Sequence, residues 1–126
     1  LFNNEEAQRI ESLRDKLENN LLQIEGAFLN GDKEKRIFNT TNISFADAHG
    51  KILITDLTKE IAVSSGSACS AASVEPSHVL AAMNVPEALS RSSIRFSLGR
   101  FTTEAEIDFT IGFVKATVEK IRHYSA

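Results

Sequence analysis

Two long amphipathic patterns, one near each end of the sequence, constrain the fold more than any other feature. Within residues 4–25, apolar side chains recur every three or four positions and polar side chains fill most of the others, which predicts a helix with one apolar face. A second pattern follows the capping box of Thr103 and Glu106 and runs to about Arg122. The two apolar stripes consist of Ala7, Ile10, Leu13, Leu17, Leu21 and Ile24 in the first helix, and of Ile107, Ile111, Val114, Val118 and Ile121 in the second.

Short strand candidates lie between these two helices. They are rich in strand-forming residues, are bounded by turn residues, and cover 27–29, 42–46, 61–64 and 92–98. The last strand has the clearest alternation, because Ile94 and Phe96 face one way and Arg95 faces the other.

A short helix and a helix stop complete the pattern. Gly26 is placed to end the first helix. Residues 51–59 are expected to form a helix that turns Ile52, Leu53 and Leu57 toward the core. Helices at both ends and short strands between them favour an α+β fold, a small and mostly antiparallel sheet covered by helices on one face.

Length and composition limit the possible functions. The chain has 126 residues, which fits one domain spanning residues 1–126. Its formal net charge of -3 argues against a dominant role in nucleic-acid binding. No apolar run approaches the roughly 18 residues that span a bilayer, and no signal peptide is visible, so no membrane partner is expected. One cysteine cannot form an internal disulfide, and a reducing cytoplasm is the expected compartment.

Cys69 is the first candidate for chemistry. It lies within residues 64–73, which are dense in Ser, Gly and Ala and offer little material for a core, so we expect a loop that lets another group approach closely. A thiolate is a strong nucleophile, although a nearby base or positive charge must help to form it at neutral pH. Free cysteines are also among the most buried residues. Local composition therefore leaves a reactive thiol and a buried filler side chain equally open.

Arg95 is the second candidate. It lies on the polar face of strand 92–98, where the flanking Ser93 and Ser97 are too short to hide it. A guanidinium fixed on a strand can make a bidentate contact to a carboxylate. The alternative is an ordinary hydrated surface charge, which is the commoner role of an arginine.

The histidines do not indicate a metal site. No pair among His49, His78 and His123 has the spacing of metal ligands, and no cysteine accompanies them at such spacing. We therefore expect no metal. The residues by themselves supply one reactive-looking thiol and one carboxylate-binding arginine, and not a complete catalytic set.

Three stretches of the sequence match one enzyme family in their order and spacing. Residues 62–70 read AVSSGSACS, residues 75–80 read EPSHVL, and residues 92–104 read SSIRFSLGRFTTE. They resemble the active-site loop, the next helix, and the last strand and helix start of cysteine desulfurases of the iron–sulfur cluster and nitrogen-fixation type. Residues 30–32 and 42–45 fit that family more weakly, and the resemblance covers most of the chain.

The resemblance implies a fold, a reaction and roles for two residues. It makes the chain the carboxy-terminal small domain of a fold-type I pyridoxal-phosphate enzyme of the class V aminotransferase family. In that family the cofactor acts as an electron sink for free L-cysteine, a loop thiolate takes the sulfur as a persulfide, and L-alanine is released. The thiol is then Cys69, and Arg95 holds the substrate carboxylate. The implied partners are L-cysteine, a sulfur-acceptor or scaffold protein, and a second copy in a full-length homodimer.

The resemblance also has a limit. The family's cofactor-binding residues belong to a large domain that no stretch of this sequence matches. We therefore expect no cofactor-binding residue in this chain, no tight binding of pyridoxal phosphate, and no turnover by the chain alone. Two alternatives stay open: a non-enzymatic persulfide or thiol carrier domain, and a selenocysteine lyase-like relative. A purely structural domain with an inert Cys69 is a third, which the composition of the loop disfavours.

Overall fold

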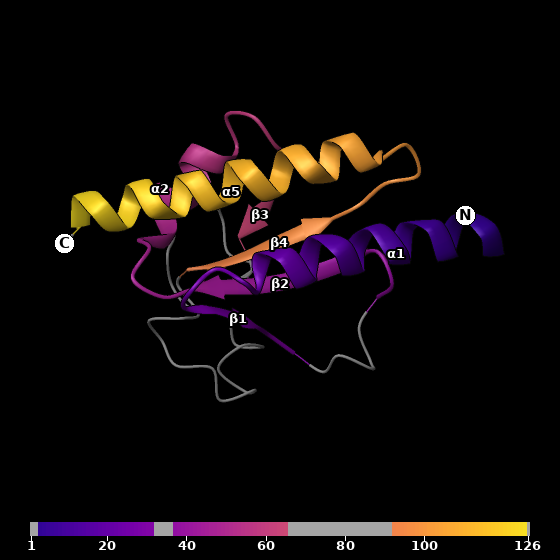
Figure 1. Cartoon of the computed structure of the whole chain (residues 1–126), viewed down its shortest axis with the longest axis horizontal. Coiled ribbons are helices and arrows are strands. Elements are labelled where there is room, and N and C mark those ends of the chain that lie inside the picture. Colours follow the sequence, from indigo (N-terminus) through magenta and orange to yellow (C-terminus); the bar gives the residue numbers. More distant parts are fainter. Residues whose placement is uncertain (1–2, 32–36, 66–91, 126) are drawn as a thin grey trace.

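The computed structural model describes residues 3–31, 37–65 and 92–125. Within these residues, two strands follow each of the first two helices, and the two longest helices are the first and last elements (Figure 1). In chain order the elements are α1 (Asn4–Leu21), β1 (Ala27–Leu29), β2 (Thr40–Phe45), α2 (Gly50–Leu57), β3 (Ser64–Ser65), β4 (Ser93–Ser97) and α5 (Glu104–Ser125).

The strands form one four-stranded sheet in the order β1-β2-β4-β3. Each neighbouring pair is antiparallel. The central pair is β2 and β4, in which Asn42 lies opposite Arg95 and Ile43 lies opposite Ile94. The predicted α+β fold with an antiparallel sheet is confirmed.

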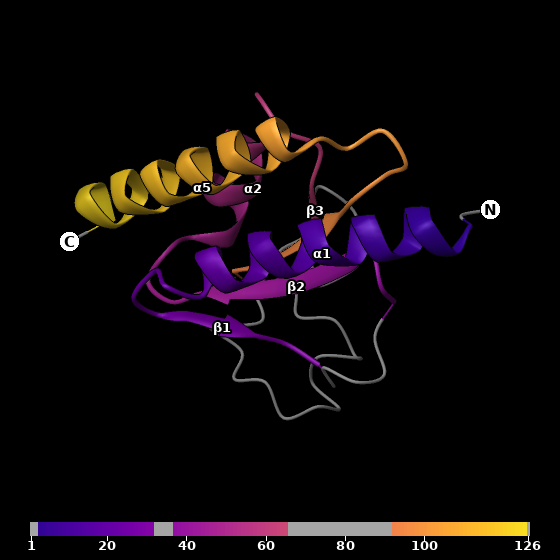
Figure 2. The same cartoon turned by 45° about the vertical axis from the view of Figure 1, so that its right-hand side comes forward.

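The three helices of the described residues cover the same face of the sheet. Figures 1 and 2 show α1 and α5 side by side above β2 and β4, with α2 next to α5. Apolar side chains from the three helices and the two central strands form a single core. Its fully buried members include Ile10, Leu17 and Leu21 of α1, Leu53 and Leu57 of α2, Val114 and Val118 of α5, and Ile43, Phe45 and Ile94 of the sheet.

Local sequence explains where the two long helices begin. The Asn3 side chain accepts a hydrogen bond from the Glu6 backbone N–H at 2.8 Å, which caps α1. At the start of α5 the capping box is confirmed, since Thr103 N donates to Glu106 Oε1 at 2.9 Å and Glu106 N donates to Thr103 Oγ1 at 3.2 Å. None of the helices in the described parts of the chain is long and apolar enough to cross a membrane.

Some element boundaries differ from those predicted. Helix α1 ends at Leu21 and not at residue 25, because residues 22–26 turn toward β1. Ile24 lies beyond the end of the helix but is nevertheless buried, so it belongs to the apolar core without being helical. Strand β3 covers Ser64–Ser65 and starts later than the predicted 61–64.

The prediction that Ile52 joins the core is wrong. Its side chain is 48% exposed, whereas Leu53 and Leu57 are fully buried. An eight-residue helix offers only a narrow buried stripe, and positions four apart share that stripe while the adjacent position does not.

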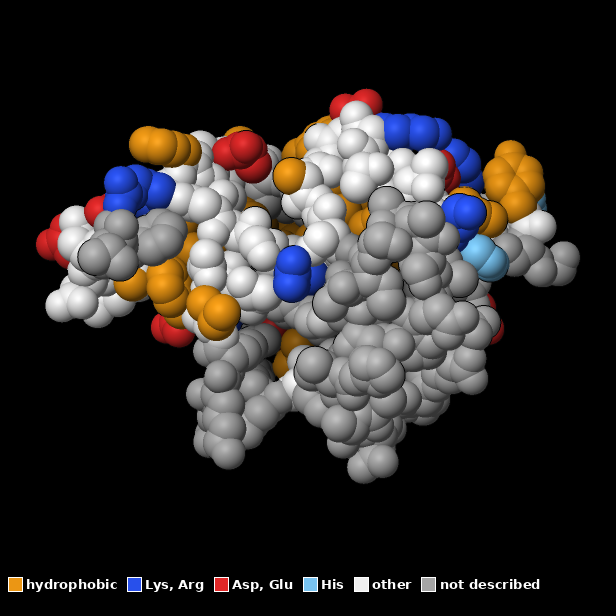
Figure 3. Space-filling view, turned by 180° about the vertical axis from the view of Figure 1, so that it is seen from behind, with side chains coloured by type: hydrophobic (Ala, Val, Ile, Leu, Met, Phe, Trp, Pro, Cys, Tyr) orange, Lys and Arg blue, Asp and Glu red, His pale blue; other side chains and the backbone are white. Residues whose placement is uncertain are grey.

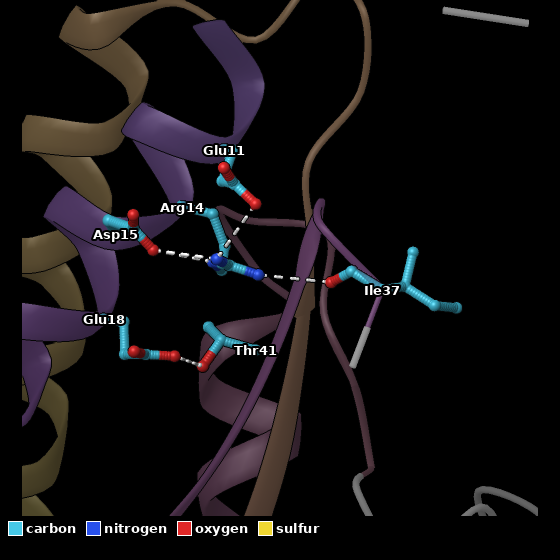
Figure 4. A network of polar contacts seen from close by, with 6 residues as sticks. All are labelled: Glu11, Arg14, Asp15, Glu18, Ile37 and Thr41. Atoms are coloured by element: carbon cyan, nitrogen blue, oxygen red, sulfur yellow. Dashed lines mark hydrogen bonds and ion pairs between the residues drawn. The ribbon is translucent and has the colours of Figure 1, made fainter. Parts of the chain in front are cut away.

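Polar contacts fix α1 over β2. The buried Glu18 carboxylate accepts a hydrogen bond from the Thr41 hydroxyl at 2.7 Å (Figure 4). One turn earlier, the guanidinium of the buried Arg14 bonds to Asp15 Oδ1 at 2.9 Å and to the backbone oxygen of Ile37 at 3.2 Å. These bonds satisfy charged groups that would otherwise be costly to bury between helix and sheet.

An exposed ion pair joins α1 to α5. Lys16 Nζ lies 2.8 Å from Asp108 Oδ1 and 2.9 Å from Glu104 Oε2. The hydrogen bonds that the Lys16 ammonium donates to Asp108 and then to Glu104 raise its pKa above the ordinary value. Lys16 therefore stays charged throughout the physiological range, although an exposed pair of this kind adds little stability.

Two glycines provide a matched test of this fold. Gly26 has a φ of +78°, and an added Cβ would lie 2.8 Å from Arg122 Nη2, which donates to the Ala46 backbone oxygen at 2.7 Å. Gly112 lies inside α5 with open space around it. We predict that Gly26→Ala lowers the free energy of unfolding by about 1–3 kcal/mol through backbone strain and crowding. Gly112→Ala should raise it by up to about 1 kcal/mol through helix propensity.

Denaturant unfolding of both variants and the parent chain measures these changes. Gly31→Ala separates the two causes, because Gly31 has a φ of +87° but nothing within 4 Å of an added Cβ. A Gly26→Ala variant as stable as the parent would contradict the packing described for this corner.

Candidate functional site

Arg95 lies at the centre of β4, on the face of the sheet opposite the one that α1, α2 and α5 cover. Strand alternation turns the neighbouring Ile94 and Phe96 into the core, where they are 1% and 3% exposed. The same alternation leaves the Arg95 side chain exposed on the opposite face. The prediction that this arginine lies on the polar side of an amphipathic strand is confirmed.

Residues of both neighbouring strands lie beside Arg95. In the antiparallel registers, Asn42 of β2 and Ser64 of β3 are its direct partners, so the three share one face of the sheet. Arg95 Nε donates a hydrogen bond to Ser64 Oγ at 3.0 Å. Among the described residues no carboxylate pairs with Arg95, and its two terminal nitrogens keep their donors available for a ligand.

A row of hydrogen-bonded polar side chains continues along this face from Asn42. The Asn30 amide nitrogen donates to Ser44 Oγ at 2.8 Å and lies 3.2 Å from Asn42 Oδ1 and 3.3 Å from Ser93 Oγ. The two serine hydroxyls lie 2.8 Å apart, and both residues are at most 1% exposed. Buried polar groups bonded in this way rigidify their surroundings. The row therefore fixes β1, β2 and β4 to one another beside Arg95.

Cys69 lies outside the described residues, as does His78. His49 is the cap residue of α2 without a side-chain capping bond, and His123 lies in the last turn of α5. Within residues 3–31, 37–65 and 92–125, no group of three or more potential ligands could hold a metal ion.

A site for pyridoxal phosphate is not provided by the described residues. The cofactor needs a lysine amine for its Schiff base and donors for its phosphate. The described lysines, however, lie on the helices or directly after one, away from the Arg95 face. They are Lys16 on α1, Lys51 on α2, Lys59 after α2, and Lys115 and Lys120 on α5. Three of them already pair with carboxylates.

A hollow of about 480 Å³ is the other candidate site. It lies between the first turns of α5 and the end of β4, and Phe96 and Leu98 are among its lining residues. Glu60 and Glu106 add negative charge, and no described lining residue is basic. The hollow therefore suits an apolar group better than a carboxylate. Elsewhere, exposed hydrophobic side chains reach the surface at separate places (Figure 3).

Comparison with protein families gives a match over most of the chain. A model of the family described as aminotransferase class-V matches residues 3–109. The chain belongs to the class-V aminotransferase family. The resemblance inferred from the three sequence motifs is confirmed at this level.

The relatives of this class-V chain include named enzymes. It is 51% identical over 120 residues to the cysteine desulfurase IscS of Histophilus somni strain 2336, which covers 95% of the chain. It is also 51% identical over 121 residues to the cysteine desulfurase IscS of Mannheimia succiniciproducens, which covers 96% of it. In both cases the chain spans 30% of the length of the relative.

Solved structures support the same fold. An X-ray structure of a NifS-like protein from Rickettsia africae matches with a TM-score of 0.76 and 29% identity, over 92% of this chain and 30% of that one. Another NifS-like protein matches with a TM-score of 0.75 and 30% identity, over 90% of this chain and 28% of that one.

The sequence patterns alone missed two features of the Arg95 face. Ser64 appeared only as part of a small-residue segment, and Asn30 only as a turn residue. Antiparallel pairing of the predicted strands would have brought segment 61–64 next to strand 92–98, but it would not have given the register that sets Ser64 opposite Arg95. The contacts of Asn30 depend on a turn between strands, whose side-chain direction has no periodic signal.

Asn30 offers a test of the polar row. We predict that Asn30→Ala lowers the free energy of unfolding by about 1–2 kcal/mol, because buried serine hydroxyls lose a hydrogen-bond donor. Asn20→Ala is the matched control, since the Asn20 amide donates to Lys16 O in an exposed part of α1. That variant should be neutral or slightly stabilising. Equal unfolding midpoints for the two variants in urea would contradict a structural role for the row.

Proposed function

We propose that this chain is the carboxy-terminal small domain of a pyridoxal-phosphate-dependent cysteine desulfurase. In this proposal Arg95 binds the carboxylate of L-cysteine, and Cys69 takes the substrate sulfur as a persulfide while L-alanine is released. The observation that carries the proposal is the exposed Arg95 side chain, whose terminal nitrogens bond to no side chain among the described residues, in a chain 51% identical to named cysteine desulfurases.

Arg95 is suited to recognise a carboxylate for physical reasons. A guanidinium is planar, permanently charged and able to form two parallel N–H···O bonds with one carboxylate. The backbone of Arg95 is fixed in a central strand of the sheet, and the Ser64 hydroxyl accepts a hydrogen bond from its Nε. A site fixed in this way gives a small amino acid one orientation, because the carboxylate is bound at two points.

Cys69 is connected to this site through β3. It follows Ser65 by four residues, and an extended chain advances at most about 3.6 Å per residue. The two Cα atoms therefore lie within about 15 Å of each other. Ser65 and Ser64 pair with Ile94 and Arg95, so this short separation along the sequence supports the proposal that the Cys69 thiol reaches a substrate bound at Arg95.

The thiol chemistry requires a thiolate. In the proposed step the Cys69 sulfur forms a bond to the sulfur of L-cysteine, and the substrate's carbon–sulfur bond breaks. The electron pair of that bond stays with the substrate carbon, which takes up a proton and becomes the methyl group of L-alanine. A thiolate makes this attack, so a base or positive charge near Cys69 has to lower the fraction of neutral thiol. We assign cofactor binding to the part of the longer relatives that this chain does not span, and expect the chain alone to be inactive.

The remaining parts of the proposal concern partners and location. A persulfide has to be passed on, so a sulfur-acceptor or scaffold protein is the proposed partner, with the full-length enzyme acting as a homodimer in the cytoplasm. A carrier domain that works without cofactor and amino acid would not need an arginine that binds a substrate carboxylate. This arginine therefore favours the enzyme over the carrier.

Removing the guanidinium tests the proposal in the full-length enzyme that contains this chain. We predict that Arg95→Ala raises the KM for L-cysteine about 10- to 100-fold, because a charged hydrogen bond contributes about 1.5–3 kcal/mol. The measurement is alanine release against L-cysteine concentration. Arg100→Ala is the matched control, because Arg100 lies beyond the end of β4 and pairs with Glu6 of α1 at 2.8 Å.

The controls make the outcome decisive. Arg100→Ala should leave the KM unchanged, and the 126-residue chain incubated with pyridoxal phosphate and L-cysteine should release no alanine. An Arg95→Ala enzyme with the parent KM would overturn the assignment of the carboxylate site. Steady alanine release by the isolated chain would overturn the assignment of cofactor binding to the part of the enzyme outside this chain.

A further inference from the structure

We infer that Ser64 is a positioning residue, whose hydroxyl holds Arg95 Nε so that the two terminal nitrogens present one fixed edge to the substrate carboxylate. This inference rests on the proposed role of Arg95. It adds a second residue to the site and states which edge of the guanidinium binds the carboxylate.

The guanidinium of Arg95 offers more than one pair of donors to a carboxylate. An arginine has five N–H donors in a fixed plane, and a carboxylate can pair with either of two edges. One edge combines Nε with a terminal nitrogen, and the other combines both terminal nitrogens. In this structure Nε already donates to Ser64 Oγ at 3.0 Å. The edge formed by the two terminal nitrogens is therefore the one left for a carboxylate.

Ser64 is itself held in place by the pairing of β3 with β4. Strand β3 has only two residues, and both are paired with β4, Ser64 with Arg95 and Ser65 with Ile94. Directly opposite residues of an antiparallel pair lie on the same face of the sheet. A short hydroxyl at this register position meets the guanidinium near its Nε without reaching the terminal nitrogens. The backbone pairing thus sets the geometry of the side-chain bond.

Within the described residues, no side chain other than Ser64 holds the Arg95 guanidinium by a hydrogen bond. In residues 3–31, 37–65 and 92–125, no carboxylate pairs with it either. An arginine side chain has a long, flexible stem. Without the serine hydroxyl, the described surroundings leave the plane of the guanidinium unfixed. The loss should therefore weaken substrate binding more than it slows the steps that follow binding.

A pair of variants of equal shape tests the inference in the full-length enzyme. Ser64→Val and Ser64→Thr both place a β-branched side chain in a strand, which favours folding, but only threonine keeps the hydroxyl. We expect Ser64→Val to raise the KM for L-cysteine about three- to tenfold, as for one lost hydrogen bond, with kcat nearly unchanged. Ser64→Thr should keep a KM near that of the parent.

Two further variants separate positioning from a general structural effect. Ser97→Ala removes another serine from the same face of β4 and should leave the KM unchanged. In the Arg95→Ala background, Ser64→Val should have no further effect, because a residue that acts through Arg95 cannot act when Arg95 is gone.

The possible outcomes are distinct. If Arg95→Ala leaves the KM unchanged, the proposed function itself fails. If Arg95→Ala raises the KM but Ser64→Val does not, only the inference about Ser64 is overturned. It is also overturned if Ser64→Thr is as impaired as Ser64→Val, or if Ser64→Val raises the KM further in the Arg95→Ala background.

Discussion

The antiparallel register between β2 and β4 is the constraint on which the rest of the structure depends. It places Asn42 opposite Arg95 and Ile43 opposite Ile94. Because side chains alternate along a strand, a slip of one residue would turn Arg95 into the core and Ile94 out of it. Burying an unpaired guanidinium among apolar side chains would be very costly. The apolar core and the exposed position of Arg95 therefore specify the same register.

The two faces of the sheet have separate tasks. The face toward α1, α2 and α5 carries the apolar core, and the long helices at the chain ends cover it. The opposite face carries Arg95 and the polar row that begins at Asn30. This division keeps the Arg95 side chain out of the apolar core, so a substitution at Arg95 leaves the packing beneath the helices intact.

Much of this arrangement could be predicted from periodicity. The stripe of α5 and the alternation of β4 each follow from a spacing that fixes which side chains share a face. The exposure of Ile52 was not predicted, because a short helix gives too few turns to define its buried side. Arg95 could be singled out because its strand is unambiguous. Its bond to Ser64 could not, since cross-strand contacts depend on registers between segments about 30 residues apart, which a one-dimensional pattern does not contain.

The proposed reaction transfers the sulfur of L-cysteine to Cys69. The most direct measurement is peptide mass spectrometry of the full-length enzyme after a single exposure to L-cysteine and rapid alkylation. The account predicts one additional sulfur atom on the peptide that contains Cys69, removed by a thiol reductant and absent from a Cys69→Ser enzyme. Release of alanine at the normal rate with no additional sulfur on Cys69 would contradict the account.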